Sequence, residues 1–156
     1  MRTTKFVLLF LLGIAVLSCK KETSEEEQAE KDREVIVTYL ADNNLEAKET
    51  ASGLFYIIED SGTGDKPSET DDVTVRYKGY FVDGKVFDQS PEEGITFNLQ
   101  NVIEGWTEGI PLFREGGNGV LLIPSHLGYG TKGSQSGAIP GRTVIIFDVK
   151  LIEVVD

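Results

Sequence analysis

The sequence predicts an α+β domain of mostly antiparallel β-strands with one short internal helix, preceded by an N-terminal helix. Residues 73–82 alternate apolar and polar side chains, as a half-buried strand does. Asp83-Gly84 follows at once and is a strong hairpin signal, which favours a turn with positive φ at both central residues. Residues 143–154 (TVIIFDVKLIEV) are rich in β-branched side chains and form the longest predicted strand.

The N-terminus has the features of a lipoprotein signal peptide. Two basic residues within 1–5 precede an apolar run over 6–17, which is too short for a membrane span of roughly 20 residues. Val16-Leu17-Ser18-Cys19 resembles the lipobox of bacterial lipoproteins, in which the cysteine is lipidated and becomes the new N-terminus. We therefore expect residues 1–18 to be removed and Cys19 to carry the lipid, with a plain signal peptide as the alternative.

The composition of the mature chain narrows the possible partners. The signal holds two of the 15 basic residues and none of the 26 acidic ones, so the mature net charge is −13. So acidic a surface is repelled by nucleic-acid phosphates, and no nucleic-acid partner is expected. Cys19 is the only cysteine, so an intrachain disulfide cannot form. At this length one domain is expected, over 53–156, after a tether and helix over 19–52.

A helix is predicted over residues 25–42. Ser24-x-x-Glu27 is typical of a capping box, and Asp42-Asn43-Asn44 is a plausible stop. One narrow apolar stripe follows helical spacing, formed by Val35, Ile36, Tyr39 and Leu40. A stripe this narrow predicts a spacer helix docked weakly on the domain, and a dimerisation arm is the alternative, so the protein is a monomer or an arm-mediated dimer.

The remaining elements follow from the pattern after Gly53. Strands are predicted over 54–59, 73–82, 95–99, 119–123 and 143–154, and a short helix over 103–113. A Gly- and Ser-rich loop covers 128–141.

Several kinds of chemistry are excluded by what the chain lacks. His126 is the only histidine and sits in a loop entry with no G-x-S-x-G before it, so a Ser-His-Asp triad is not expected. Without clustered His or Cys ligands, no metal site is expected. The Gly-rich loop lacks the phosphate-binding spacing, so no cofactor is expected either. Six aromatic residues, spread over six elements, are core residues or the lining of an apolar pocket: Tyr77, Phe87, Phe97, Trp106, Tyr129 and Phe147.

Four segments in succession resemble the signatures of the FKBP-type peptidyl-prolyl isomerases, over about residues 53–154. They are VRYKGYFVDGKVFDQS, VIEGWTEGIPLF, LLIPSHLGYG and IPGRTVIIFDVKL. With the lipobox, the chain is similar to lipid-anchored bacterial members, including gliding-associated lipoproteins. The resemblance implies an antiparallel sheet curled around one short helix, with a substrate pocket between them.

The resemblance also implies roles for individual residues. Those expected to act on the substrate are Tyr77, Phe87, Asp88, Trp106, Tyr129 and Phe147. Those expected to line the groove beside them are Ile95, Phe97, Val102, Ile103 and Ile139. The family usually has an aromatic residue where this chain has Ile95, a larger residue at Ala138, and Pro-Pro-Asn where this chain has 140–142 (PGR). These departures bear on substrate preference.

The expected chemistry needs neither nucleophile nor metal. An Xaa–Pro bond isomerises over a barrier of about 18–20 kcal/mol through a twisted amide. A dry aromatic pocket that favours the twisted form lowers that barrier. Asp88 is expected to accept a hydrogen bond from Tyr77 and face the twisted carbonyl, and capping of backbone N–H groups is its alternative role.

The sequence thus predicts a prolyl isomerase that acts on proline-containing polypeptides of the cell envelope. The alternatives are an FKBP-like chaperone or binding module with little catalysis, and an interaction subunit that uses the arm. Lys20 follows the cysteine where an Asp would retain some lipoproteins at the inner membrane. This favours anchoring at an outer membrane.

Overall fold

The computed structural model describes residues 17–155. The predicted signal peptide, 1–18, lies outside the described residues except at its last two positions, and so does the side chain of Cys19. A membrane-spanning helix is absent from residues 17–155, since no helix there combines the length and apolar character that a bilayer crossing needs.

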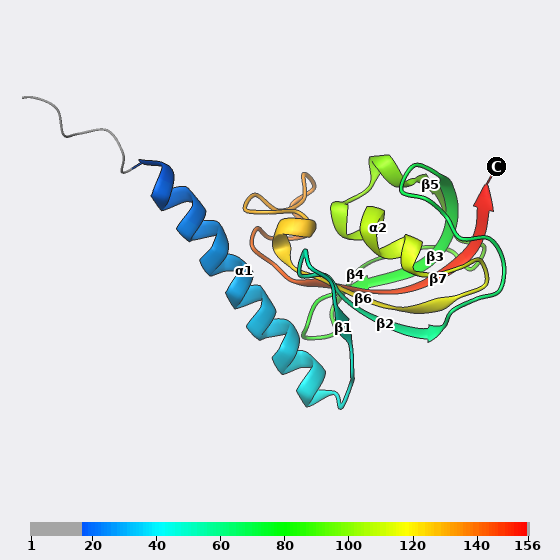
Figure 1. Cartoon of the computed structure of the whole chain (residues 1–156), viewed down its shortest axis with the longest axis horizontal. Coiled ribbons are helices and arrows are strands. Elements are labelled where there is room, and N and C mark those ends of the chain that lie inside the picture. Colours follow the sequence, from blue (N-terminus) through cyan, green and yellow to red (C-terminus); the bar gives the residue numbers. More distant parts are fainter. Residues whose placement is uncertain (1–16, 156) are drawn as a thin grey trace, which may run out of the picture.

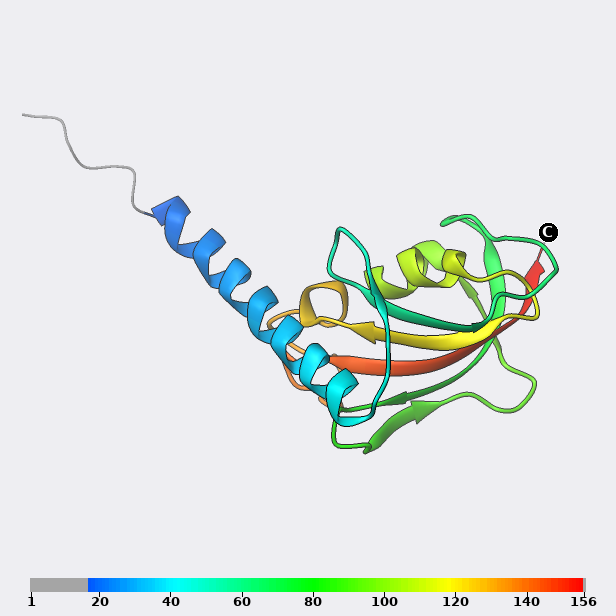
Figure 2. The ribbon, with the colours of Figure 1, turned by 60° about the horizontal axis from the view of Figure 1, so that its bottom comes forward.

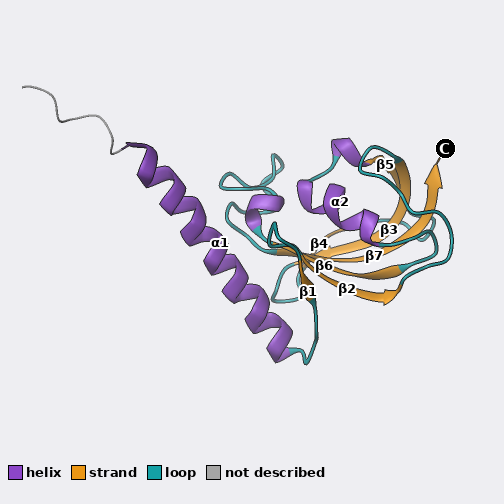
Figure 3. Cartoon of the chain, in the orientation of Figure 1, coloured by secondary structure: helices purple, strands orange, loops and turns teal. Residues whose placement is uncertain are grey.

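A single seven-stranded antiparallel sheet forms the domain (Figures 1 and 3). Its strands are β1 (Lys48–Glu49), β2 (Phe55–Asp60), β3 (Asp72–Tyr80), β4 (Val86–Gln89), β5 (Ile95–Asn98), β6 (Asn118–Ile123) and β7 (Ile145–Val155). They are ordered β1-β2-β6-β7-β3-β4, with β5 also paired to β3. Every pairing is antiparallel, where the sequence pattern predicts mostly antiparallel strands.

Strand β3 organises the part of the sheet that carries the pocket. Its first half pairs with β5, from Asp72↔Asn98 to Val75↔Ile95. Its second half pairs with β4, where Gly79 lies opposite Asp88. The other edge of β3 pairs with β7 along its whole length. Residues of β3, β4, β5 and β7 are thereby brought side by side although they are spread over 84 positions of the chain.

The short internal helix lies against one face of the sheet (Figure 2). It consists of α2 (Glu104–Gly109), which continues into the 3₁₀ turn η2 (Ile110–Leu112). Two glycines let α2 lie close to β6, because a Cβ would stand 2.6 Å from Ile123 at Gly105 and 2.7 Å from Leu121 at Gly109. Two further 3₁₀ turns, η1 (Leu99–Asn101) and η3 (Ser125–Leu127), flank α2 and β6 in the sequence.

Alternate residues of the strands separate two apolar clusters. On β6, Leu121 and Ile123 belong to the cluster under α2, and Leu122 belongs to a second cluster. On β7, Phe147 and Ile146 divide in the same way. This alternation is the period-two pattern of a sheet that is covered on both faces.

The helix α1 (Leu17–Asp42) covers the second cluster with its C-terminal half, and its N-terminal half extends away from the sheet (Figures 1 and 2). Its predicted end is confirmed, but its predicted start at 25 is wrong, since Ser24 lies inside the helix. The segment from Lys20 to Glu34 has no Gly or Pro and many good helix formers, so the helix continues through it. Ile36 and Leu40 are buried, whereas Val35 of the predicted stripe is exposed.

The hairpin between β3 and β4 is confirmed, but its turn differs from the predicted type. Only Gly84 has a positive φ, of 84°. Gly84 N donates to Phe81 O at 2.8 Å and Phe81 N donates to Lys85 O at 3.0 Å. This is a three-residue loop in which a turn is followed by a left-handed glycine. Asp83 caps it by accepting from Lys85 N at 2.9 Å.

Candidate active site

A cavity of about 570 Å³ opens between the sheet, α2 and the 128–141 loop. This is the size range of small-ligand sites. Ten predicted site residues line it: Tyr77, Phe87, Asp88, Phe97, Val102, Ile103, Trp106, Tyr129, Ile139 and Phe147. The lining also includes Asn101, Ser134, Ser136 and Ala138.

The floor of the cavity is a set of aromatic rings around Trp106. The indole meets the rings of Tyr77, Phe97 and Phe147 edge to face, at centroid distances of 5.2, 5.5 and 5.3 Å. Phe87 continues the set by an edge-to-face contact with Phe147 at 5.6 Å. Such contacts add about 0.5–1.5 kcal/mol per pair beyond area burial. The floor is therefore apolar and closely packed, with Trp106 and Phe147 buried.

The buried indole of Trp106 leaves one polar atom without a partner. Nε1 is inaccessible to solvent and forms no hydrogen bond within residues 17–155. Three rings surround the indole edge to face. Because aromatic faces are weak acceptors for an N–H group, these rings are the acceptors nearest in kind to a hydrogen-bond partner for Nε1.

One carboxylate stands at the wall of this apolar floor. The Tyr77 hydroxyl donates to Asp88 Oδ2 at 2.8 Å, which confirms the predicted hydrogen bond. Burial and this hydrogen bond raise the pKa of Tyr77 well above its ordinary value, so the phenol stays protonated into the alkaline range. No backbone N–H within residues 17–155 donates to Asp88, so the turn-capping alternative finds no support.

The Gly- and Ser-rich loop forms the outer wall. Tyr129 stands at the cavity mouth, 37% exposed, and burial together with the nearby charge of Asp88 raises the pKa of its phenol. Deeper in the loop, Ser134 N donates to Ile139 O and Ile139 N donates to Ser134 Oγ, both at 2.9 Å. This reciprocal pair keeps Ile139 buried against the cavity.

One predicted site residue lies elsewhere, and four lining residues were not among the predicted site residues, although Ala138 was noted as a departure from the family. Ile95 is 39% exposed and does not line the cavity, because it sits two positions along β5 from Phe97, roughly 7 Å away. Asn101, Ser134 and Ser136 were missed, since polar residues in a loop carry no periodic signal. The proximity of the two serines to a conspicuous tyrosine was the only available hint.

The structure shows no arrangement suited to metal or triad chemistry in the described range. Among residues 17–155, no three His, Cys, Asp or Glu side chains lie close enough together to hold a metal ion. His126 is exposed on η3, as predicted for a surface residue, and its Nε2 lies 2.9 Å from Ser52 O.

Comparison with protein families gives a match over residues 64–152 to the FKBP-type peptidyl-prolyl cis-trans isomerases. The probable isomerase FkpA of Neisseria meningitidis is 47% identical over 109 residues, which are 69% of this chain and 40% of that protein. FkpA of Escherichia coli is 41% identical over the same length and shares. The chain spans less than half the length of these relatives.

Solved structures of the same kind share the fold. A peptidyl-prolyl cis-trans isomerase from Pseudomonas syringae superposes with a TM-score of 0.70 at 34% identity, covering 84% of this chain and 96% of the other. FkpA from Escherichia coli gives 0.70 at 34% identity, covering 88% of this chain and 67% of the other.

Proposed function

The chain belongs to the FKBP-type peptidyl-prolyl cis-trans isomerase family, and we propose on this premise that it accelerates the isomerisation of Xaa–Pro bonds in polypeptides of the cell envelope. The observation that carries the proposal is the cavity itself, in which a floor of edge-to-face aromatic rings meets one carboxylate bonded to a phenol. A proline ring is apolar and compact, and this floor fits its chemistry.

Catalysis in such a cavity follows from differences between the planar and the twisted amide. Twisting breaks the amide resonance, so the nitrogen becomes pyramidal and the carbonyl becomes less polar. The planar form loses more hydration than the twisted form when it enters a dry site, so the barrier falls. In this mechanism Phe87, Trp106 and Phe147 grip the ring and exclude water.

The polar groups orient the peptide and transfer no proton. Tyr129, at the mouth, would donate its hydroxyl proton in a hydrogen bond to a neighbouring peptide carbonyl. Both phenols are protonated and able to donate at neutral pH, and the raised pKa values of Tyr129 and Tyr77 extend this into the alkaline range. Asp88 would face the rotating carbonyl carbon and favour the arrangement in which its oxygen has turned away.

Anchoring at the envelope is the second part of the proposal. The lipobox-like Val16-Leu17-Ser18-Cys19 supports lipidation of Cys19, which would become the N-terminal residue of α1. The helix would then hold the domain at a distance from an outer membrane, where newly exported chains fold. Mass spectrometry of the N-terminal peptide tests the lipid, and a Cys19→Ala variant should be released from membranes.

The isomerase proposal is tested with full-length protein in mild detergent and short Xaa-Pro peptides. Phe87→Ala should lower kcat/KM by about tenfold or more, because about 1.4 kcal/mol of transition-state binding is a factor of ten. Val86→Ala is the matched control, since Val86 is 45% exposed and does not line the cavity.

Either of two results would count against the proposal. A folded parent without activity would favour the alternative, an FKBP-like module that binds chains without catalysis. Equal activity in Phe87→Ala and the parent would show that isomerisation occurs away from this cavity.

A further inference from the structure

Helix α1 is joined to the domain by a buried polar contact. Asp32 of α1 and Ser125 of η3 are 2% and 3% exposed. Asp32 Oδ2 accepts hydrogen bonds from Ser125 N at 2.8 Å and from Ser125 Oγ at 2.6 Å. Asp32 Oδ1 accepts a third, from Gln28 Nε2 at 2.7 Å. These are the two buried polar side chains among the residues whose burial the structure describes.

Burying a carboxylate at this interface costs desolvation free energy. The second apolar cluster, with Ile36 one turn further along α1, already supplies apolar contact between α1 and the sheet. Buried charges rarely stabilise more than apolar side chains of similar volume, but they fix the geometry of the donors that satisfy them. The contact therefore serves to hold Ser125 in one place.

Ser125 in turn holds the backbone around Tyr129. Ser125 O accepts hydrogen bonds from Gly130 N at 2.7 Å and from Gly128 N at 3.1 Å. These glycines are the two neighbours of Tyr129, whose side chain lines the cavity mouth. A continuous set of hydrogen bonds thus runs from the carboxylate on α1 to both sides of the cavity tyrosine.

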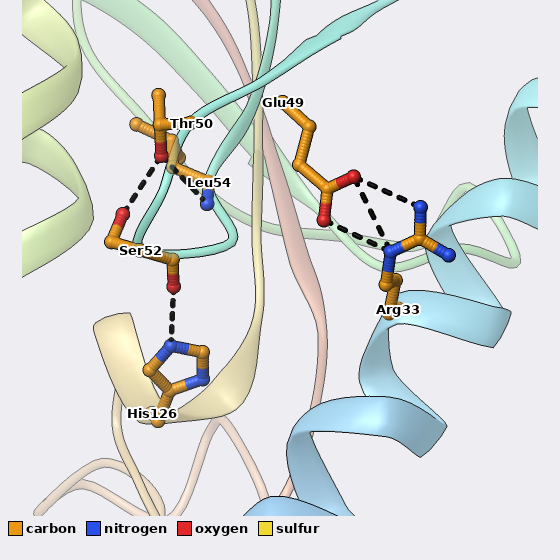
Figure 4. Close-up of polar contacts among 6 residues, drawn as sticks. All are labelled: Arg33, Glu49, Thr50, Ser52, Leu54 and His126. Carbon is orange, nitrogen blue, oxygen red and sulfur yellow. Dashed lines mark hydrogen bonds and ion pairs between the residues drawn. The ribbon is translucent and has the colours of Figure 1, made fainter.

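The surroundings of η3 restrict it further (Figure 4). His126, the next residue, contacts Ser52 O through Nε2 at 2.9 Å, which ties η3 to the turn between β1 and β2. Arg33 of α1 forms an ion pair with Glu49 of β1, with Nε and Oε1 3.0 Å apart. Two adjacent residues of α1 therefore contact two different parts of the domain. Of the two, Asp32 contacts η3, the turn that precedes the loop carrying Tyr129.

We propose that Asp32 is a positioning residue of the cavity, which sets the place of Tyr129 through Ser125. It lies outside the segment matched by the family, residues 64–152, so the N-terminal helix contributes to the site as well as to the tether. The proposal rests on the proposed function for its kinetic consequence, and its structural consequence is independent of catalysis.

The kinetic test compares Asp32→Ala with Arg33→Gln in the full-length protein. Asp32→Ala should lower kcat/KM for Xaa-Pro peptides by about five- to tenfold, because small misplacements of an orienting group reduce rates strongly. Arg33→Gln, which removes a contact of the same helix without touching η3, should leave kcat/KM unchanged. No loss in Asp32→Ala, or an equal loss in Arg33→Gln, would overturn the proposal.

A double-mutant cycle separates positioning from general destabilisation. The Asp32→Ala effect should disappear in a Tyr129→Phe background, since a misplaced hydroxyl no longer matters once it is absent. An undiminished effect in that background would overturn the proposal. If Asp32→Ala fails to fold, Ser125→Ala replaces it. That change removes one of the three hydrogen bonds to Asp32 and keeps the backbone N–H donor. A loss of about twofold in kcat/KM is expected, and it should likewise disappear in the Tyr129→Phe background.

Amide hydrogen exchange at Gly130 reads the structural consequence without any activity. Exchange should become roughly tenfold faster in Asp32→Ala and stay at the parental rate in Arg33→Gln. Unchanged exchange in Asp32→Ala would overturn the proposal even if activity fell. An inactive parent with the expected exchange pattern would instead count against the proposed function alone.

Discussion

Two tyrosine–aspartate hydrogen bonds of equal length lie on opposite faces of the sheet. Tyr77 donates to Asp88 and Tyr80 donates to Asp148, both at 2.8 Å. The two tyrosines stand three residues apart on β3, so their side chains point to opposite faces. Asp148 also lies 3.1 Å from the ammonium group of Lys78, whereas Asp88 has no cation within ion-pair distance in residues 17–155.

The two pairs have the same residue types and the same hydrogen bond, but they differ in their surroundings. Tyr80 packs against the cluster under α1, and its carboxylate partner is balanced by a cation. Asp88 faces a cavity, and its charge is bonded only to a neutral phenol. A carboxylate of this second kind lies where a ligand entering the cavity would meet it.

The largest loss of isomerase activity is expected from a substitution that disturbs only the cavity side of β3. A Cβ at Gly79 would stand 2.6 Å from the ring of Phe87 and 2.7 Å from that of Phe147. Gly79→Ala therefore displaces both rings, and kcat/KM for Xaa-Pro peptides should fall by about 30-fold or more, with roughly 1–3 kcal/mol lost from the free energy of unfolding.

Gly84→Ala is the control for Gly79→Ala. Nothing lies within 4 Å of a Cβ at Gly84, but its φ of 84° is strained for alanine. That variant should lose about 1 kcal/mol or more of unfolding free energy and keep its activity. Full activity in Gly79→Ala would show that the two rings do not shape the site.

The comparison is tested directly by removing each phenol hydroxyl. Tyr77→Phe keeps the ring contacts and loses the bond to Asp88, so kcat/KM should fall by about fivefold. Tyr80→Phe should lose roughly 1 kcal/mol of unfolding free energy and keep its activity. Peptide isomerisation and urea unfolding on the same samples separate the two outcomes. A similar loss of activity in both would mean that the two pairs differ less than their surroundings suggest.

A smaller difference in activity is expected when the two carboxylates are neutralised in turn. Asp88→Asn keeps an acceptor oxygen but removes the charge at the cavity wall, and we expect about a threefold fall in kcat/KM. Asp148→Asn breaks an exposed ion pair with Lys78, which is worth at most about 1 kcal/mol, and activity should be unchanged. Parental activity in Asp88→Asn would assign Asp88 to hydrogen bonding alone.

Most of the fold was predictable because its signals are local. The alternation on β3 and the β-branched residues of β7 indicate strands irrespective of their neighbours. The start of α1 was missed because a capping box is a favourable local pattern that a run of good helix formers can override. Likewise, Asp83-Gly84 indicated a hairpin, but its loop length depends on where the ladder resumes, at Lys85.

The site was predictable only as far as side-chain type marks it. Large aromatic residues are conspicuous, and their convergence followed from the family resemblance. The exclusion of Ile95 depends on how far along β5 the cavity extends, which no short motif encodes. The contact between Asp32 and Ser125 joins positions 93 apart in the sequence, so nothing in either local pattern connects them.

The last and smallest predicted effect is on the free energy of unfolding, and it appears only at alkaline pH. Burial and the hydrogen bond to Asp148 raise the pKa of Tyr80 above its ordinary value of 10.0, and burial with the bond to Asp88 does the same for Tyr77. As pH rises past about 10, the unfolded chain loses these phenol protons while the folded protein keeps them. The contribution of these groups to the unfolding free energy should therefore be complete and independent of pH at neutral pH, and it should fall from about pH 10 upward.

Urea unfolding at a series of pH values between about 8 and 11 measures this decline. The slope should be shallower in Tyr80→Phe and in Tyr77→Phe than in the parent, because each variant lacks one phenol that the folded state keeps protonated. Isomerase activity should stay flat from about pH 6 to 9, since twisting the amide transfers no proton. A parental slope in Tyr80→Phe would mean that its bond to Asp148 does not favour the protonated phenol, and the contrast between the two faces would then rest on the cavity alone.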